Sequence, residues 1–368
     1  MKYGYWLPVF GGWLRNVDDE RMEASWDYSR RLAQRSEEIG FDLTLVAELS
    51  LNDIKGADAP TLDAWSTAAA LAAVTKRLEL MVAVRPTFHN PALLAKQAAN
   101  IDRIAGPGRL SLNVVSSWWA DEAKKCGLHF DTHDDRYART AEWLAVVDGI
   151  WKQDHFSFTG KYYKVEDSVM QPKPITKPRP VIYAGGESEA AKELISTQCD
   201  AYVMHGDPPK RIREKIADMA ERRERKGLPP MTYGVAAYSI VRDTEAEAKR
   251  ELARITDVQQ NARGYDNYQQ WIAGTNLDRK VSLEDYSVTN RGLASGLVGT
   301  AEQVREQVAE FEAAGADLLL LQCSPQLEEM ERFAESVIRR APTPAAEEAA
   351  RVSSPLVFDV MPALGRDY

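Results

Sequence analysis

The stretches "GFDLTLVAE" (residues 40–48) and "GADLLLLQCS" (residues 315–324) share one pattern: a glycine, one residue, an aspartate and then an apolar run. Each follows a segment with helical spacing, and Val304, Val308 and Phe311 mark the buried face of the second one. A glycine just past a helix adopts the left-handed conformation that ends the helix. A nearly continuous apolar run is typical of a parallel strand buried on both faces. The pattern therefore predicts helices that lead directly into buried parallel strands.

This alternation extends along nearly the whole chain of 368 residues. Strands are predicted at residues 3–7, 42–46, 78–84, 109–115, 181–184, 201–204, 234–241 and 317–321. Helices are predicted at residues 26–39, 62–75, 91–104, 134–151, 187–196, 208–226, 243–258, 301–314 and 327–340. Eight strand–helix units favour a (β/α)₈ barrel, also called a TIM barrel, although counting alone leaves a doubly wound sheet open.

Three segments depart from the alternation. Residues 155–168 predict a β-hairpin that turns at Thr159 and Gly160, inserted after the fourth strand unit. Residues 259–298, after the seventh strand, are polar and too long for an ordinary connection, which indicates a lid or a disordered insertion. We expect one barrel domain over residues 1–340. The tail, residues 341–368, ends in an apolar stretch and is predicted to pack on the barrel or on a partner subunit.

Composition narrows the functional classes. A net charge of −9 argues against nucleic acid as a partner. No apolar run approaches the roughly 20 residues of a membrane helix, so we expect no membrane insertion. Three widely spaced cysteines indicate a reducing cytoplasm and no disulfide framework. The five histidines lack HxH or HExxH spacing, so we predict no metal site.

In a barrel the chemistry lies where the strands end. "SLNVVSSWWADE" (residues 111–122) places Asn113 inside an apolar strand and follows it with paired serines and tryptophans. That pattern suits an ordinary turn or the wall of a cofactor pocket equally well. "YAGGES" (residues 183–188) opens a helix, and its glycines and serine suit either a phosphate site or a plain capped turn.

Two further groups have both a structural and a functional interpretation. "HDDRYAR" (residues 133–139) is typical of a capped helix, but Arg136 and Tyr137 are also residue types that bind phosphate. The carboxylates Glu48, Asp58 and Asp63 would serve a metal-free hydrolase, but solvated loop charges are the commoner outcome. GxGxxG, Walker and GxSxG sequences are absent, so no dinucleotide fold, NTPase or serine hydrolase is indicated.

Taken in order, several motifs resemble the bacterial-luciferase-like flavin monooxygenases, over about residues 3–340. They are "YWLP", "GRLSLNVVSSW", "HDDRYARTAEW", "PVIYAGGES" and "LVGTAEQVREQVAEFEAAGAD". The branch with alkanesulfonate, dimethylsulfone and pyrimidine monooxygenases is the most similar. The resemblance implies a (β/α)₈ barrel that uses molecular oxygen and reduced FMN, with the flavin supplied by a separate NAD(P)H:FMN reductase. It also implies a cytoplasmic homodimer or homotetramer.

The resemblance implies roles for the cofactor residues. Asn113 and Ser116 match positions that line the flavin ring. Arg291 matches a residue of the mobile lid. The phosphate end of the FMN site is matched by Tyr137, Gly185, Gly186, Glu187 and Ser188.

Oxygen transfer and the substrate pocket are assigned in the same way. Thr61 matches a position near the flavin that alkanesulfonate enzymes fill with cysteine. We expect Thr61, Asn113 and His89 to assist oxygen transfer, although a structural histidine explains His89 better. The substrate pocket is expected to contain Phe10, Trp13, Trp118 and Tyr238; Trp118 and its neighbour Trp119 cannot both face inward on one turn.

The departures from the alkanesulfonate pattern indicate the substrate. Those enzymes carry three histidines and an arginine where this chain has Phe10, Ala236, Tyr238 and Gln326. Burying a sulfonate anion without such cations is unfavourable, so a small neutral organosulfur compound such as a sulfone is expected. Two alternatives on the same barrel stay open, a deazaflavin-dependent oxidoreductase and a non-catalytic flavin-binding protein.

Overall fold

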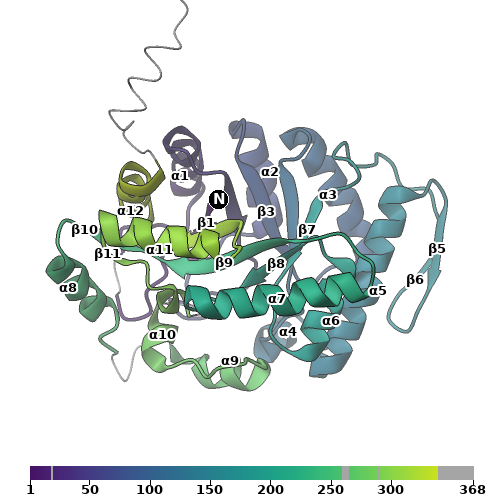
Figure 1. Ribbon diagram of the computed structural model, residues 1–368. Helices are drawn as coiled ribbons and strands as arrows, with labels where there is room; N and C mark the ends of the chain where they lie inside the picture. Colours follow the sequence, from purple (N-terminus) through teal and green to yellow (C-terminus); the bar gives the residue numbers. More distant parts are fainter. Residues whose placement is uncertain (18–19, 259–264, 289–290, 339–368) are drawn as a thin grey trace, which may run out of the picture.

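The chain forms a closed barrel of eight parallel strands surrounded by helices (Figure 1). The computed structural model describes residues 1–17, 20–258, 265–288 and 291–338. The barrel strands, in their order around the barrel, are β1 Lys2–Leu7, β12 Leu318–Gln322, β9 Thr232–Tyr238, β8 Ala201–Met204, β7 Val181–Ala184, β4 Leu110–Val114, β3 Glu79–Val84 and β2 Leu43–Val46. The prediction of a (β/α)₈ barrel is confirmed.

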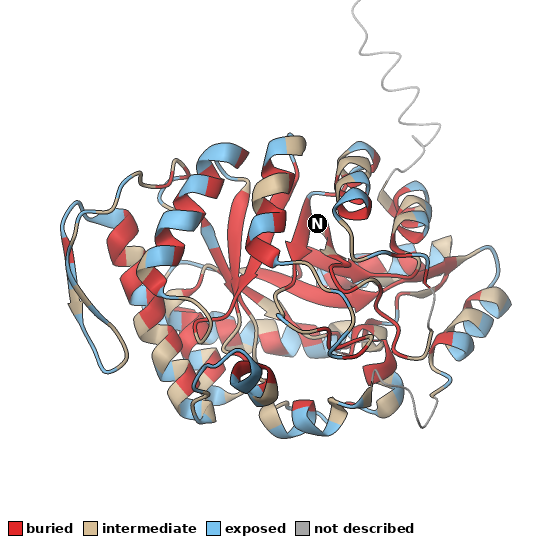
Figure 2. Ribbon diagram, turned by 180° about the vertical axis from the view of Figure 1, so that it is seen from behind, coloured by how far each residue is buried: buried red, intermediate tan, exposed pale blue. Residues whose placement is uncertain are grey.

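Helices cover the outside of the barrel, and their inner faces are buried against it (Figure 2). They are α1 Trp26–Ile39, α2 Ala64–Val74, α3 Pro91–Ala105, α5 His133–Lys152, α6 Glu189–Gln198, α7 Pro209–Arg225, α11 Ala301–Ala313 and α12 Gln326–Phe333, which continues as a π-helical turn, Ala334–Ile338. Helix α8 Glu245–Ile255 packs instead on a separate small ribbon outside the barrel, formed by residues 240–242 and 298–300 (Figure 1). The short helix α4 Ala120–Lys125 follows β4 and was not predicted.

The glycine–aspartate pattern joins neighbouring strands. Gly40 has a φ of 104°, and its N–H donates to the carbonyl of Ser36 to end α1. Asp42 then accepts a hydrogen bond from the backbone N–H of Tyr3 at 2.8 Å, which aligns β2 with β1. Asp317 does the same for Tyr233 at 2.9 Å, aligning β12 with β9.

Asp200 supplies a third copy of this device without the glycine. It accepts from the backbone N–H of Ile182 at 2.8 Å, just before β8. An aspartate directly before a buried strand is therefore the informative part of the pattern.

Two segments lie outside the barrel. Strands β5 Phe156–Thr159 and β6 Lys164–Ser168 pair antiparallel and project from the side of the molecule (Figure 1). The predicted strand 234–241 proves to be two elements, because the chain leaves the barrel after β9. The second element, β10 Ile240–Arg242, pairs instead with β11 Val298–Thr300 in a separate parallel ribbon.

The predicted insertion at residues 259–298 contains three short helical elements among its described residues. It contains α9 Tyr268–Gly274, α10 Leu283–Ser287 and the 3₁₀ turn η2 Gly292–Ser295. Helices α9 and α10 lie together on one side of the barrel (Figure 1). Residues 259–264 and the predicted tail, 341–368, lie outside the described residues. We call residues 265–288 and 291–298 the covering segment.

Candidate functional site

A cavity opens at the C-terminal ends of the barrel strands, the side on which barrel enzymes carry their chemistry. Every barrel strand, or the loop directly after it, contributes to the wall, together with α5 and the covering segment. Most of the residues predicted from the sequence line it, namely Phe10, Trp13, Asn113, Ser116, Trp118, Tyr137, Gly185, Gly186 and Glu187. The predicted residues Thr61, His89, Ser188, Arg291 and Tyr238 do not line it.

The end of β4 presents unpartnered polar atoms to the cavity. Asn113 is 7% exposed, and its buried Oδ1 has no hydrogen-bond partner among the described residues. The hydroxyl of Ser117 is likewise buried and unpartnered. Ser116 differs, because its hydroxyl pairs with that of Thr140 on α5 at 3.0 Å. Both serines lie at the strand end expected from the sequence, and the free hydroxyl belongs to Ser117.

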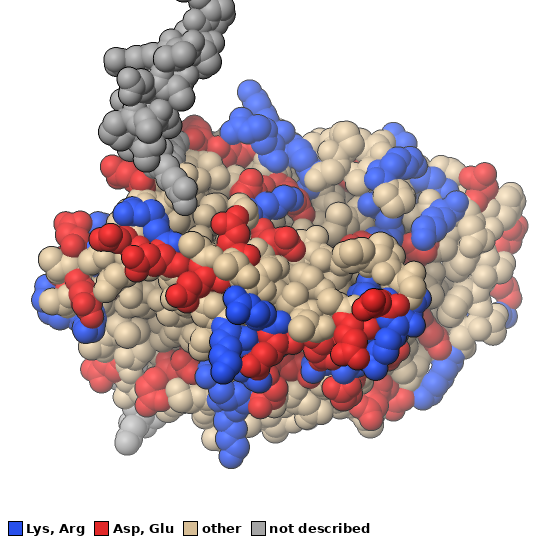
Figure 3. Space-filling model, viewed as in Figure 1, with Lys and Arg blue, Asp and Glu red and all other residues tan. Residues whose placement is uncertain are grey.

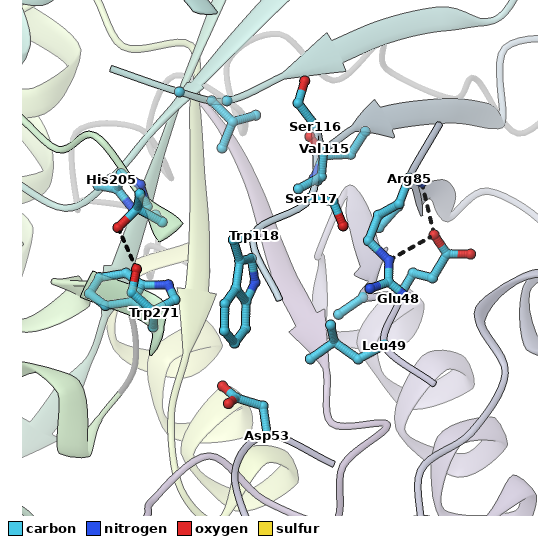
Figure 4. A pocket seen from close by; sticks show the side chains of 18 of the residues that line it. Glu48, Leu49, Asp53, Arg85, Val115, Ser116, Ser117, Trp118, His205 and Trp271 are labelled. Atoms are coloured by element: carbon cyan, nitrogen blue, oxygen red, sulfur yellow. Dashed lines mark hydrogen bonds and ion pairs between the residues drawn. The ribbon is translucent and has the colours of Figure 1, made fainter. Parts of the chain in front are cut away.

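The two tryptophans after β4 have different environments. Their rings stack with centroids 5.4 Å apart and an interplanar angle of 4°. Trp118 lines the cavity, whereas Trp119 is 1% exposed and does not. Figure 4 shows Trp118 between His205 and Trp271 on one side and Glu48 and Arg85 on the other. Trp118 is therefore the tryptophan available to a ligand.

Where α5 meets the cavity, the wall carries a cation without an acidic partner. The guanidinium of Arg136 donates only to backbone carbonyls, including those of Ser116 at 3.1 Å and Gly274 at 3.3 Å. No carboxylate of the described residues forms an ion pair with it. Burial raises the pKa of the neighbouring Tyr137, opposed by a hydrogen bond with Ser188 and by the charge of Arg136. Ser188 itself caps α6.

Gly186 brings the backbone close to this part of the wall. A Cβ atom there would come within 2.6 Å of the side chain of Ala191 and 3.1 Å of the Tyr137 hydroxyl. Its φ of 150° also disfavours a side chain. The tyrosine, the arginine and this turn converge as a phosphate site requires.

Glu187 and Arg291 form an ion pair. Glu187 lines the cavity, whereas Arg291 does not. Arg291 is fully buried; its guanidinium contacts Glu187 and donates to Asp278 at 2.9 Å. Lys215 contacts the same Glu187 oxygen at 2.6 Å and Asp207 at 2.7 Å. Burial alone would raise the pKa of Asp278, but its hydrogen bonds and the charges of Lys215 and Arg291 lower it instead.

We call these five residues the ion network. Glu187, Asp207 and Asp278 lie close enough together to suggest a metal site, but their charges are met by Lys215 and Arg291. The network joins the ends of β7 and β8 to the covering segment. Its position explains why Arg291 lines no part of the cavity.

The remaining predicted residues occupy supporting positions. The imidazole of His89 contacts Glu48, and Glu48 rather than His89 forms the wall. The Thr61 hydroxyl is buried and unpartnered in the loop before α2, away from the cavity. Tyr238 lies under η2 in a separate apolar cluster with Leu14, so β9 presents Ala236 to the cavity instead.

Several wall residues were not predicted as site residues. Arg85 donates to Glu122 through both terminal nitrogens and to Glu48 through its backbone N–H. Arg15 donates to Asp53 at 2.7 Å. Arg15 and Arg85 lie outside the motifs used above, and the ion pairs that hold them at the wall join segments far apart in the chain.

His205 lines the cavity at the end of β8. Burial, more than any neighbouring charge, lowers its pKa, so the imidazole is neutral at pH 7. A histidine directly after a predicted barrel strand was the available signal.

The sequence model of one family, described as luciferase-like monooxygenase, matches residues 1–318. The chain belongs to this family. The luciferase-like family membership predicted from the sequence is thus confirmed, and with it the class of enzyme, a monooxygenase.

Two curated relatives are 35% and 34% identical to this chain over 346 residues. Both are named FMNH₂-dependent dimethylsulfone monooxygenase, from Pseudomonas putida and from Pseudomonas fluorescens (strain Pf0-1). The alignments cover 92% of this chain and 94% and 93% of the two relatives.

Solved luciferase-like structures share the fold. A long-chain alkane monooxygenase superposes with a TM-score of 0.77 at 20% identity, covering 95% of this chain and 92% of that one. DmoA from Hyphomicrobium sulfonivorans superposes with a TM-score of 0.71 at 17% identity, covering 95% and 88%.

Proposed function

We propose that the protein is an FMNH₂-dependent monooxygenase that uses molecular oxygen to oxygenate a small neutral organosulfur compound, with dimethylsulfone as the first candidate. The names of the two curated relatives support the reaction and the substrate class. The observation that carries the proposal is the cavity itself. It joins one cation that lacks an acidic partner to unpartnered polar atoms and aromatic walls.

These residues fit a flavin mononucleotide. We assign the phosphate to the end formed by Arg136, Tyr137, Gly186 and the start of α6 at Ser188. A guanidinium bound only to carbonyls can still accept a dianion as its partner. We assign the flavin ring to the β4 end, where Asn113 offers an acceptor. Bound reduced FMN supplies the activation of oxygen, and the protein orients the reactants and excludes water.

The charges of the wall favour a neutral substrate. Arg15 is paired with Asp53, and Arg85 with Glu48 and Glu122. His205 is neutral, because burial lowers its pKa. Once Arg136 binds phosphate, the described wall offers no unpaired cation to a sulfonate, and a buried anion without one is unfavourable.

The covering segment is proposed as the lid. Trp271 and residues 274–277 form part of the cavity wall. A Cβ atom on Gly274 would lie 2.6 Å from the carbonyl oxygen of Trp118, so only glycine allows this close contact. A lid seated there would keep water from the reacting flavin.

Partners and assembly follow from the same proposal. We infer that an NAD(P)H:FMN reductase supplies the reduced flavin and that the protein acts in the cytoplasm as a homodimer or homotetramer. Among the described residues, no helix has the length and apolarity needed to cross a membrane. Acidic and basic side chains are interspersed on the face drawn in Figure 3, which does not favour nucleic acid.

Oxygen accounting tests the reaction. The protein is mixed with FMN, NADH and a flavin reductase, with dimethylsulfone, with methanesulfonate or with neither. We expect dimethylsulfone to be consumed and methanesulfonate not to be. With dimethylsulfone, part of the oxygen taken up should not be recovered as hydrogen peroxide. If peroxide accounts for all oxygen under every condition, the protein binds flavin without this catalysis. A response to deazaflavin and none to reduced FMN would indicate the deazaflavin-dependent alternative.

The phosphate assignment has a sharper test. Arg136→Gln is expected to weaken FMN binding about 10- to 100-fold more than riboflavin binding, the size of a hydrogen bond to a charged group. Arg139→Gln, on the same helix but paired with Asp131, is the matched control and should retain FMN affinity. Equal losses for FMN and riboflavin would contradict a phosphate role.

A further inference from the structure

Ser117 has a backbone conformation that serine rarely adopts. Its φ is 65°, in the left-handed region. It lies just beyond β4, which ends at Val114, and it lines the cavity. Strained backbone of this kind persists only where the surroundings determine it, and it gathers at functional sites.

The surroundings of Ser117 hold it from both sides. The carbonyl of Ser116, directly before it, accepts from the guanidinium of Arg136 at 3.1 Å. The carbonyl of Trp118, directly after it, lies against Gly274 of the covering segment. One residue further back, the N–H of Val115 donates to β3 at 2.9 Å. The fold therefore keeps this twist in place.

The twist sends two consecutive hydroxyls in different directions (Figure 4). Ser116 pairs with Thr140 on α5, whereas the Ser117 hydroxyl is buried in the cavity wall without a partner. Ser117 is 8% exposed, so bulk water does not satisfy it. Buried polar atoms without partners are uncommon, and a cavity that holds one is suited to a ligand that supplies the partner.

We propose that the Ser117 hydroxyl donates a hydrogen bond to a ring carbonyl oxygen of the bound flavin and so helps to position the ring. This inference rests on the proposed function. Asn113, four residues earlier, offers an unpartnered acceptor to the same cavity. A carbonyl acceptor beside an N–H donor occurs in the pyrimidine part of a flavin, whereas dimethylsulfone and oxygen have no donor for Asn113.

The direct test is to measure flavin binding to the protein in the absence of substrate. Quenching of the tryptophan fluorescence by FMN is the readout. Oxidised FMN and anaerobically reduced FMN are both titrated. We expect Ser117→Ala and Ser117→Gly each to weaken binding about five- to tenfold, the size of one neutral hydrogen bond. Ser29→Ala is the matched control, because Ser29 on α1 also has a buried, unpartnered hydroxyl but lies away from the cavity.

A second readout separates ligand binding from a merely structural role. Without flavin, Ser117→Gly should melt at a higher temperature than Ser117→Ala, because glycine adopts this φ without strain. Both should nevertheless lose flavin affinity equally.

Other results would overturn the inference. Wild-type flavin affinity in Ser117→Ala would remove the hydroxyl from the flavin site. Unchanged flavin affinity with a raised KM for dimethylsulfone would make the substrate its partner instead. If the wild-type protein itself bound neither form of FMN, the proposed function would fail, and the inference with it.

Discussion

The two sides of the cavity are built on opposite principles. On the β4 side, Asn113 and Ser117 bring polar atoms to the wall that no described residue satisfies. On the β7–β8 side, the ion network pairs every carboxylate with a cation. A buried carboxylate without a cation is costly, whereas a neutral polar atom, or a guanidinium held by backbone carbonyls as in Arg136, can await a ligand at lower cost. The first side is thus prepared for binding, and the second holds the covering segment.

The largest expected effect comes from breaking the ion network. Arg291→Gln leaves Glu187 with only Lys215, and Asp278 with Lys215 and the exposed Arg211. The free energy of unfolding should therefore fall by about 3–5 kcal/mol, as for other broken buried pairs. Urea denaturation measures it. Arg225→Gln, which removes an exposed pair with Glu221, is the control and should leave the midpoint unchanged. Equal midpoints for the two variants would show that the network does not stabilise the fold.

A second prediction compares two buried asparagines. The Asn52 side chain makes four hydrogen bonds in the loop after β2, so Asn52→Leu should lower the free energy of unfolding by about 2–4 kcal/mol. Asn113→Leu removes an unsatisfied oxygen and should leave stability unchanged or raise it. Its expected loss is in FMN affinity, about tenfold. A large stability loss in Asn113→Leu would mean that the residue is structural.

The third prediction concerns pH. Burial lowers the pKa of His205 in the folded protein; the charges of Arg291 and Lys215 act in the same direction, and those of Glu187 and Asp207 oppose it. The unfolded chain, with a pKa of about 6.5, therefore binds a proton that the folded chain resists. Stability should fall as pH drops below that value, by at most about 1.4 kcal/mol per pH unit.

The variant His205→Gln isolates this contribution, because the other groups titrate in both proteins. Unfolding free energies at pH 7.5 and pH 5.5 should differ less in the variant than in the wild type. The same pH dependence in both would show that folding does not lower the pKa of His205.

The smallest expected effect separates the neighbouring serines. Ser116→Ala should lower the free energy of unfolding by about 0.5–1.5 kcal/mol, because it breaks the hydrogen bond to Thr140. Its loss of FMN affinity should be smaller than that of Ser117→Ala. The reverse order would return the flavin contact to Ser116, as the sequence predicted. Chemical denaturation and fluorescence titration decide between them.

The strand ends could be predicted from the sequence because they depend on local chemistry. Glycine after a helix, aspartate before a strand and a continuous apolar run together located the barrel strands to within a residue or two. The exception was the seventh strand, where β9 and β10 are contiguous in sequence and both apolar. Only the pairing of β10 with β11 divides them, and that pairing joins residues far apart in the chain.

The sequence by itself determined the barrel and the strand ends that form the cavity, because apolar periodicity and caps act between near neighbours. Its ordered motifs indicated the family by resemblance. Tertiary structure alone decided the direction of each side chain there. Arg291 turns into the ion network, Tyr238 lies under η2, and Ser117 rather than Ser116 offers its hydroxyl to the cavity. Those outcomes depend on which charges and carbonyls distant segments bring together, such as Arg136 against Ser116 and Gly274. Such long-range contacts cannot be predicted from the local spacing of residues in the sequence.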